Sequence, residues 1–472
     1  MGTGELSPKG LAVPRIPSIP RLPGLPDPLR RVHLPRDLES VTAIGHEEAA
    51  AGDMSVESVE RIWSAAVGLY RSGVHPAVQV CVRRHGAIVL DRAIGHARGN
   101  GPHDGAEVEK HPATPATPFV IYSGAKAVTA FVVHMLHERG SLDISDRVCQ
   151  HIDEYDCHGK GEITIAHVLA HRAGVPNLPR EAFDLDRVRD REFRVQALCD
   201  ARPFAKPGRF LAYHAVSGGH ILGEIVHRVT GKDIRTVLAE EILDPLGFRW
   251  TNYGVAPESL SRVALNYVTG PPTAPPLSRL LSRALGLPFD ELVEASNDER
   301  FLTAIVPSAN VVTTANELAR FYELLRRGGE LDGVRIVTPE TVRNAITQQS
   351  HLEVDLSLGF PSRFGYGLML GAQVLSLYGR DTQHAFGHLG FTNILAWADP
   401  ERALACAVMT NGKPVLYPEL LRFYGLMQRI TSEAAKVQGS EMAVWDPLAG
   451  RPRGDEPARR ARPRARRAGG SS

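Results

Sequence analysis

Residues 123–136 read SGAKAVTAFVVHML, and their apolar side chains recur with the spacing of one face of an α-helix. The predicted helix opens at Ser123 and ends at Gly140. A first turn offers unpaired N–H groups and a positive dipole end, which favour a developing oxyanion. Lys126 follows one turn later on the same face, within reach of the Ser123 hydroxyl. Because a lysine with a lowered pKa can take that proton, the pair predicts a serine nucleophile with a lysine base. The alternative is a surface helix with a capping serine and a solvated lysine.

A tyrosine lies where a loop runs into the next glycine-rich helix. Residues 207–213 read PGRFLAY, and the helix predicted over 216–229 ends at Gly231. At such a junction the Tyr213 side chain can point into a cleft, where a phenol can relay a proton between nucleophile and leaving group. A tyrosine that only packs in the core is the alternative.

A third motif precedes a late strand, which is predicted over 392–398. Residues 387–391 read GHLGF. Gly387 and Gly390 would let the edge of the strand approach a substrate closely. The backbone N–H of Phe391 would be a second oxyanion donor beside the N–H of Ser123. His388, with an ordinary pKa near 6.5, would offer a hydrogen bond without a permanent charge.

Strand-forming segments lie towards both ends of the chain, and the middle is mostly helical. Thr314 and Glu317 predict a capping box in front of a helix over 315–327. We expect an α/β fold of the α+β type, with an antiparallel sheet flanked by helices and an inserted helical subdomain. The other predicted elements are helices over 55–72 and 416–430 and two hairpins, 77–83 with 87–93 and 392–398 with 403–409.

Composition divides the chain into three parts. Prolines recur every third residue from 14 to 26, the period of polyproline II, so residues 1–51 are predicted to be a stiff, disordered leader. The alternative is an arm that packs on the body or on a neighbouring subunit. Residues 441–472 are predicted to be a disordered, Arg- and Pro-rich tail. The domain between them, 52–440, is predicted to have sheet halves at about 52–122 and 305–440 and a mainly helical insertion at about 141–304.

The net charge of +1 conceals an uneven distribution. Residues 451–467 hold eight arginines against Asp455 and Glu456, a net charge of +6, so the rest of the chain has a net charge of −5. The folded body therefore offers no basic face for nucleic acid. The tail is predicted to be solvated, with contact to an anionic surface as the alternative.

Cysteine usage and hydropathy bear on the cellular compartment. The five cysteines are odd in number and widely spaced, which suits a reduced compartment. The first thirty residues hold no apolar signal region, and no apolar run approaches the ~18 residues of a membrane span. These features predict a cytoplasmic protein.

Two further patterns are not read as catalytic or metal sites. Histidine pairs occur four residues apart, at His167 and His171 and at His384 and His388, but neither pair has the glutamate of a zinc protease. We interpret them as structural or substrate-lining residues. Ser217 lies in AVSGG, which lacks the first glycine and the strand–turn–helix context of a nucleophile elbow.

Together the three motifs resemble the serine β-lactamase and penicillin-binding-protein superfamily, and within it the class C-like esterases called family VIII carboxylesterases. The resemblance covers most of residues 52–430. It implies a β-lactamase-like catalytic domain in which Ser123 is acylated, Lys126 is its base and Tyr213 relays the proton, with His388 and Gly390 in the third motif. It implies no metal and no organic cofactor. Residues 163–176, 308–310, 327–329 and 399–401 also resemble family segments.

Two departures from the family pattern bear on the substrate. The family usually has an asparagine two residues after the tyrosine, which binds a substrate amide and steadies the lysine; here the residue is Ala215. The third motif usually begins with a lysine that recognises a substrate carboxylate, and here it begins with His388. A site without both polar contacts should prefer neutral acyl groups, which points to esters.

The sequence therefore predicts a serine carboxylesterase or lipase-type hydrolase that cleaves small-molecule esters with short to medium acyl chains. A β-lactamase, a D-alanyl carboxypeptidase or an acyltransferase of the same superfamily is the first alternative. The others are a non-catalytic binding scaffold and an interaction protein that works through its two ends. The sequence predicts no oligomeric state.

Overall fold

The computed structural model describes residues 27–105, 107–351, 353–415 and 420–437. The proline repeat of the leader and the arginine-rich tail lie outside these residues. Over the described ranges, no helix is long and apolar enough to cross a membrane.

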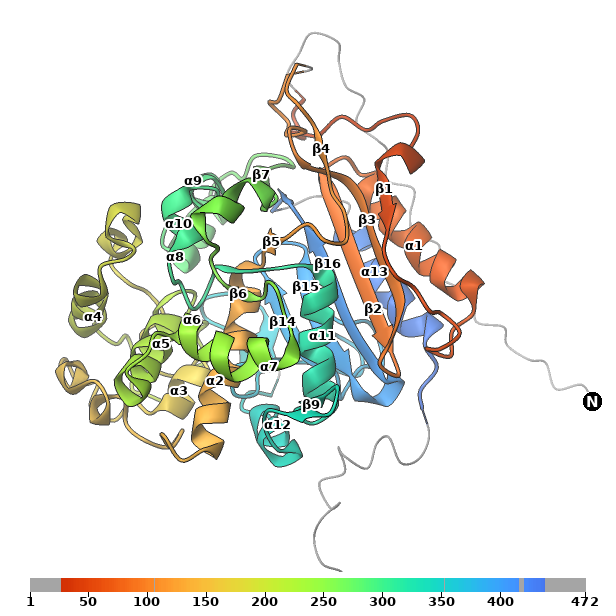
Figure 1. The fold of residues 1–472 in the computed structure, drawn as a ribbon. Coiled ribbons are helices and arrows are strands. Elements are labelled where there is room, and N and C mark those ends of the chain that lie inside the picture. Colours follow the sequence, from red (N-terminus) through yellow and green to blue (C-terminus); the bar gives the residue numbers. More distant parts are fainter. Residues whose placement is uncertain (1–26, 106, 352, 416–419, 438–472) are drawn as a thin grey trace, which may run out of the picture.

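An antiparallel sheet forms the centre of the molecule (Figure 1). Its strands run in the order β1-β3-β2-β16-β15-β14-β13, and the short β4 pairs with β3. An early strand thus meets a late one where β2 pairs with β16. The bounds are β1 (Thr42–Ile44), β2 (Ala77–Arg84), β3 (Ala87–Arg98), β4 (His111–Pro112), β13 (Met369–Leu370), β14 (Phe386–Gly390), β15 (Ile394–Asp399) and β16 (Leu404–Thr410).

Both predicted hairpins are confirmed, because β2 pairs with β3 and β15 pairs with β16 in antiparallel register. His85 and Gly86 join the first pair with φ of 53° and 90°. A two-residue hairpin turn of this kind needs positive φ at both positions, which glycine adopts without strain.

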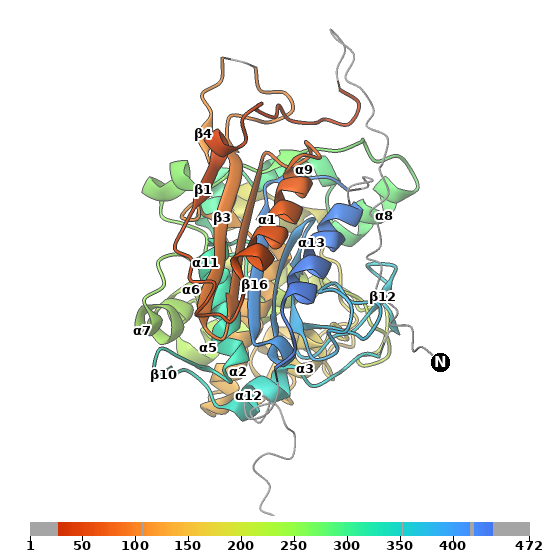
Figure 2. The same ribbon diagram turned by 90° about the vertical axis from the view of Figure 1, so that its right-hand side faces the viewer.

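The two faces of the sheet bury side chains of different size. In β16, Leu404, Cys406 and Val408 face one core, and Ala405 and Ala407 face the other, as the two-residue period of a strand requires. α1 (Val56–Tyr70) and α13 (Leu420–Glu433) lie side by side over the first face (Figure 2). α11 (Ala315–Arg326) packs on the second face, where the alanines leave room for it.

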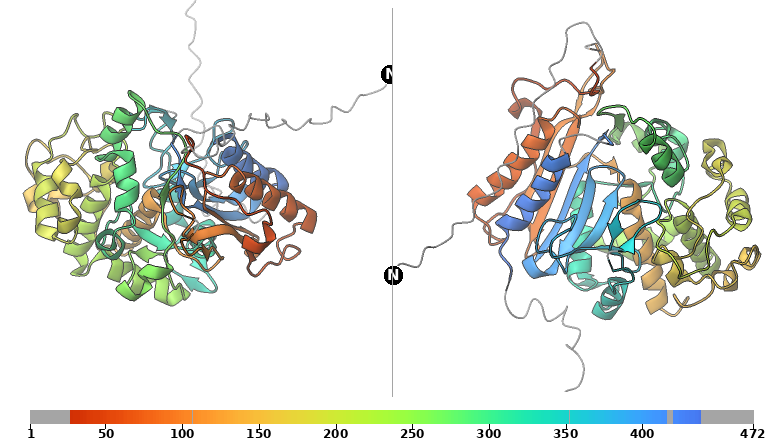
Figure 3. Two further views of the ribbon diagram at one scale, coloured as in Figure 1. Left: turned by 90° about the horizontal axis from the view of Figure 1, so that it is seen from above. Right: turned by 180° about the vertical axis from the view of Figure 1, so that it is seen from behind.

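A mainly helical region lies beside the second face of the sheet (Figure 3). α2 (Ala125–Glu138), which begins directly after Ser123-Gly124, lies between this region and the sheet and contacts both β14 and α5. The other helices are α3 (Ile165–Leu169), α4 (Arg191–Asp200), α5 (Ser217–Thr230), α6 (Ile234–Leu238), α7 (Asp244–Leu246), α8 (Leu277–Leu285), α9 (Phe289–Ala295), α10 (Glu299–Thr303) and α12 (Pro339–Ala345). The small strands are β5 (Phe119–Val120), β6 (Asn252–Tyr253), β7 (Tyr267–Val268), β8 (Val311–Thr313), β9 (Glu330–Leu331), β10 (Val334–Arg335), β11 (Glu353–Val354), β12 (Pro361–Ser362) and β17 (Gly412–Lys413).

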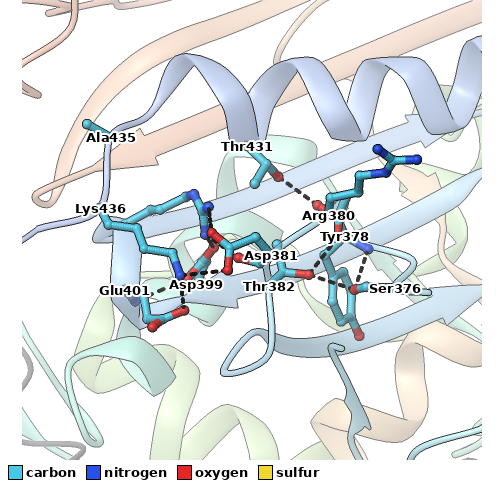
Figure 4. Close-up of polar contacts among 12 residues, drawn as sticks. Ser376, Tyr378, Arg380, Asp381, Thr382, Asp399, Glu401, Thr431, Ala435 and Lys436 are labelled. Carbon is cyan, nitrogen blue, oxygen red and sulfur yellow. Dashed lines mark hydrogen bonds and ion pairs between the residues drawn. The ribbon is translucent and has the colours of Figure 1, made fainter. Parts of the chain in front are cut away.

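Polar contacts hold the segment before β14 against the end of α13 (Figure 4). The Thr431 hydroxyl donates to the Tyr378 carbonyl over 2.6 Å. The Lys436 ammonium lies 2.9 Å from the Asp381 carboxylate and 3.1 Å from that of Glu401. These contacts fix the chain that leads into β14, the strand with the third motif.

The structure corrects the predicted end of the leader. β1 (Thr42–Ile44) pairs with β3, so the chain joins the sheet before residue 51. Just after β1, the Glu47 carboxylate accepts hydrogen bonds from the Arg92 guanidinium. A three-residue strand is too short to show a hydrophobic period, which is why the predicted boundary is too late.

The predicted capping box is only half formed. The Thr314 hydroxyl accepts from the Glu317 amide, as the pattern predicts. The Glu317 carboxylate instead accepts from the backbone amides of Arg249 and Trp250 and from the Thr251 hydroxyl. The competing donors come from a distant loop, which the local pattern does not contain.

Candidate active site

The structure brings Ser123 and Lys126 together at the start of α2. Ser123 lies in a 3-10 turn, Tyr122–Gly124, and the α-helix begins at Ala125, slightly later than predicted. The Lys126 Nζ is 3.1 Å from the Ser123 Oγ. The serine is partly exposed and the lysine is buried, so the nucleophile is reachable while its partner is shielded from water.

Two backbone carbonyls position the Lys126 amine. Its Nζ donates to the carbonyl of Ala215 over 2.7 Å and to that of Ser308 over 3.1 Å. Burial lowers the pKa of Lys126 to about 7. Because carbonyl oxygens only accept, a neutral amine directs its two N–H bonds at them and leaves its lone pair for the Ser123 hydroxyl. The geometry suits a base that removes the serine proton.

Tyr213 lies over the same pair. The Lys126 Nζ is 4.8 Å from the centre of the Tyr213 ring. Burial raises the pKa of Tyr213 above its ordinary value, and a hydrogen bond with the Ser123 side chain opposes this only in part. The phenol therefore stays protonated and can donate a proton. Its backbone amide donates to the Asp355 carboxylate over 3.0 Å, which fixes the loop that holds it.

Three buried imidazoles surround Tyr213 and remain neutral. Burial lowers the pKa of His214 and of His388 to about 3, and it lowers that of His171 well below its ordinary value. When Lys126 is protonated, its positive charge acts in the same direction on the pKa of all three. The His171 ring packs 4.6 Å from the Tyr213 ring. The wall around the nucleophile is therefore polar but carries no permanent positive charge.

His388 has one ring nitrogen engaged and one free. Its Nδ1 lies 2.7 Å from the Leu389 carbonyl and must donate to it. Its Nε2 is buried and has no hydrogen-bond partner among the described residues. A neutral ring with this tautomer presents an acceptor, so His388 can receive a hydrogen bond but cannot replace a charged lysine.

The third motif precedes a late strand, β15, as predicted, but the motif is itself a strand, which the prediction missed. Residues 386–390 form β14, and β14 pairs with β15 along its length. A Cβ on Gly387 would lie 2.1 Å from the Ala396 carbonyl oxygen of that neighbour. The glycines that suggested a loop are needed for close approach of two strands.

A residue with positive φ lies next to one predicted oxyanion donor, Ser123, and the other predicted donor, Phe391, has positive φ itself. Tyr122, just before Ser123, has φ of 48°, and Phe391 has φ of 43°. Residues other than glycine rarely adopt such angles, and they cluster at functional sites. The two rings stack with centroids 4.9 Å apart, and Phe289 stacks on the far side of Phe391 at 4.8 Å. This aromatic stack holds the turn of the nucleophile against the end of β14.

Gly390 allows the end of β14 to lie close to the turn that contains Ser123. A Cβ at this position would lie 2.2 Å from the carbonyl oxygen of Ile121, two residues before the nucleophile. The close neighbour is therefore the protein backbone, whereas the sequence suggested a substrate.

We expect Gly390→Ala to lower kcat by about a hundredfold, because the added methyl group must push the Phe391 amide away from Ser123. Steady-state kinetics on a p-nitrophenyl ester would measure the loss. Gly425→Ala is the matched control, since a Cβ there meets no atom within 4 Å. Unchanged kcat in a folded Gly390→Ala protein would contradict this role for the glycine.

Several contributors to the site carry no signal in the sequence. The carbonyls of Ala215 and Ser308 act through the backbone, so no residue type marks them. Asp355 lies in a loop, and its Oδ1 accepts from the amides of Tyr213, Ser357 and Leu358. Such a loop aspartate could be found only through its three-dimensional neighbours.

Among the described residues, neither Ser217 nor a cluster of metal ligands contributes to this site. The Ser217 hydroxyl is buried at the start of α5 and donates to the Val175 carbonyl over 2.7 Å, so it is not exposed as a nucleophile. Across the described ranges, no three histidine, cysteine, aspartate or glutamate side chains converge as metal ligands.

Comparisons with known proteins found similar sequences and similar folds. The sequence profile described as Beta-lactamase matches residues 59–425. The esterase/beta-lactamase LipL of Mycobacterium tuberculosis (strain ATCC 25618 / H37Rv) is 30% identical over 338 residues, which cover 68% of this chain and 75% of LipL. The crystal structure of a family VIII carboxylesterase is similar with a TM-score of 0.68 and 26% identity, over 80% of this chain and 98% of that one. A penicillin-binding protein homologue from Caulobacter crescentus also gives a TM-score of 0.68, with 25% identity and the same coverage.

Proposed function

The chain belongs to the beta-lactamase family and is a hydrolase of that fold, and from this premise we propose that it is a serine carboxylesterase acting on short to medium acyl chains. The main observation behind this proposal is the buried Lys126 amine, which lies 3.1 Å from the Ser123 Oγ and is held by two backbone carbonyls, with a pKa that burial lowers to about 7.

In the first step, Lys126 takes the hydroxyl proton of Ser123 as the Oγ attacks the ester carbonyl. The amides of Ser123 and Phe391 hold the negative charge on the carbonyl oxygen. Tyr213 then passes its proton to the departing alkoxide, and the alcohol leaves the acyl-enzyme. Lys126 returns the serine proton to the Tyr213 phenolate, so both groups regain their starting states. In the second step, water loses a proton to Lys126 and attacks the acyl carbon. The bond from the acyl carbon to the Ser123 Oγ breaks, the Oγ takes this proton back from Lys126, and the free acid leaves.

The surroundings of the nucleophile support an ester over a lactam or a peptide. Ala215 contributes only its carbonyl, which holds Lys126, and has no side-chain amide to bind a substrate amide. His388 is neutral and offers an acceptor, so it has no charge with which to recognise a substrate carboxylate. The similarity to a family VIII carboxylesterase supports ester hydrolysis, whereas LipL, which is described as an esterase/beta-lactamase, supports ester and lactam hydrolysis alike.

We expect the purified protein to hydrolyse p-nitrophenyl butyrate with a kcat/KM at least about a hundredfold above that for nitrocefin, because a lactam loses the polar partners that it needs here. Release of p-nitrophenol and of opened nitrocefin, followed side by side, would measure the ratio. A series of acyl lengths would give the preferred chain. Nitrocefin turnover equal to ester turnover would overturn the ester assignment, and transfer of the acyl group to added alcohol in place of water would indicate an acyltransferase.

A further inference from the structure

A pocket of about 300 Å³ lies beside the predicted proton relay. One wall includes Ala212, which precedes Tyr213 in the chain. Another includes Leu356, which follows the Asp355 that holds the Tyr213 amide. The pocket therefore shares its walls with the loops that position the phenol, and its volume is at the small end of the range for ligand sites.

Helix α8 also lines the pocket, and the chain leads from α8 to a residue that contacts Phe391, the predicted second oxyanion donor. α8 contributes Leu280, Arg283 and neighbouring residues to the lining. It leads through a short loop into α9, whose first residue, Phe289, stacks on Phe391. Segments that line the pocket therefore continue along the chain into Tyr213 and into Phe289, which are the basis for connecting this pocket with the candidate site.

Two arginines line this pocket from separate segments. Arg202 comes from the loop after α4, and Arg283 comes from α8. Neither has an ion pair within the part of the chain that the structure describes, and no aspartate or glutamate is among the described lining residues. Two guanidinium groups around one hollow repel each other, and a bound anion would offset that repulsion. Asn177 also lines the pocket and is a further polar residue there.

Most of the remaining lining residues are apolar, and some of their side chains are largely exposed. Phe204 is 51% exposed and Leu280 is 47% exposed. Apolar rings and aliphatic chains beside unpaired guanidinium groups suit a ligand with an aliphatic stretch that ends in an anion. A planar guanidinium binds a carboxylate through two parallel hydrogen bonds, so a carboxylate is the anion that fits best.

Resting on the proposed ester hydrolysis, we propose that this pocket binds an ionised carboxyl group separated from the reacting carbonyl by an aliphatic chain. The substrate class is then monoesters of aliphatic dicarboxylic acids. This agrees with the neutral surroundings of Ser123, because the charge lies at the far end of the acyl chain and not next to the reacting bond.

The test compares p-nitrophenyl hydrogen octanedioate with the neutral p-nitrophenyl octanoate. We expect Arg202→Gln and Arg283→Gln each to lower the ratio of kcat/KM for the anionic ester over the neutral ester by about tenfold, mainly through KM. Arg279→Gln is the matched control, since this exposed arginine also lies on α8 but does not line the pocket. Its ratio should equal that of the wild type. An unchanged ratio in both pocket variants would overturn the inference, while turnover of octanoate would leave the ester function standing.

Binding can be measured without turnover. Calorimetry with Ser123→Ala protein should show monomethyl octanedioate, which carries one carboxylate, binding more tightly than the neutral methyl octanoate, and adding Arg202→Gln and Arg283→Gln should remove the difference. Equal affinity for the two ligands would overturn the carboxylate site even if no ester were hydrolysed, whereas failure to hydrolyse any ester would count against the proposed function alone.

Discussion

Ser123→Ala should reduce ester hydrolysis by at least about a thousandfold, since loss of the nucleophile removes the covalent route entirely. The fold should survive, because the Ser123 side chain is partly exposed and its neighbour Lys126 retains two carbonyl acceptors. Release of p-nitrophenol would measure the activity, and a fluorophosphonate followed by mass spectrometry would show whether the labelled residue is Ser123.

Ser217→Ala is the matched control for this variant. It removes the buried hydrogen bond to the Val175 carbonyl, at a cost of about 1 kcal/mol in stability, and leaves the nucleophile in place. Full activity in Ser123→Ala would show that the nucleophile is misassigned. Wild-type protein that neither hydrolyses esters nor takes up the fluorophosphonate would favour a binding scaffold.

Lys126→Met should lower kcat/KM by about a thousandfold, because methionine fills a similar volume but cannot accept the serine proton. In the wild type, kcat/KM should rise with pH and level off above about 7, since only the neutral amine is a base and burial lowers the pKa of Lys126 to about 7. At pH 6 it should be about a tenth of its plateau. The variant should lose this rise along with most of its activity.

Lys160→Met separates the loss of a base from the loss of buried hydrogen bonds. The Lys160 amine is also buried and donates to backbone carbonyls, among them Leu198 at 2.8 Å and Ala201 at 2.9 Å. It lies away from Ser123, so its replacement should lower the melting temperature without removing the activity of the folded protein. If Lys126→Met kept the activity and pH profile of the wild type, Lys126 would not be the base.

The parts of the fold that the sequence predicted are those with a strong local signal. The hairpin around His85-Gly86 combines alternating apolar residues with a turn that glycine favours. α2 has an uninterrupted helical period and a glycine stop. β1 is too short to have a period, and β14 carries glycines that are needed for contact with its neighbours, so both were missed.

In the candidate site, too, some contributors could be predicted from the sequence and others could not. Ser123, Lys126, Tyr213 and His388 have side chains whose types and order suggest the proposed chemistry, and the structure brings them together. The carbonyls that orient Lys126 and the aspartate that holds the Tyr213 loop depend on contacts between segments far apart in sequence. No local pattern encodes such contacts, so they required the three-dimensional structure.

The pairing of β2 with β16 affects when the candidate site can form during translation. During synthesis, the serine helix leaves the ribosome long before β14 and β16 exist. Native contacts between segments so distant in sequence close slowly, and unpaired strands remain exposed meanwhile. The Phe391 amide, the proposed second oxyanion donor, can therefore reach Ser123 only after β14, β15 and β16 have been translated. A nascent chain would carry its nucleophile in an unreactive state.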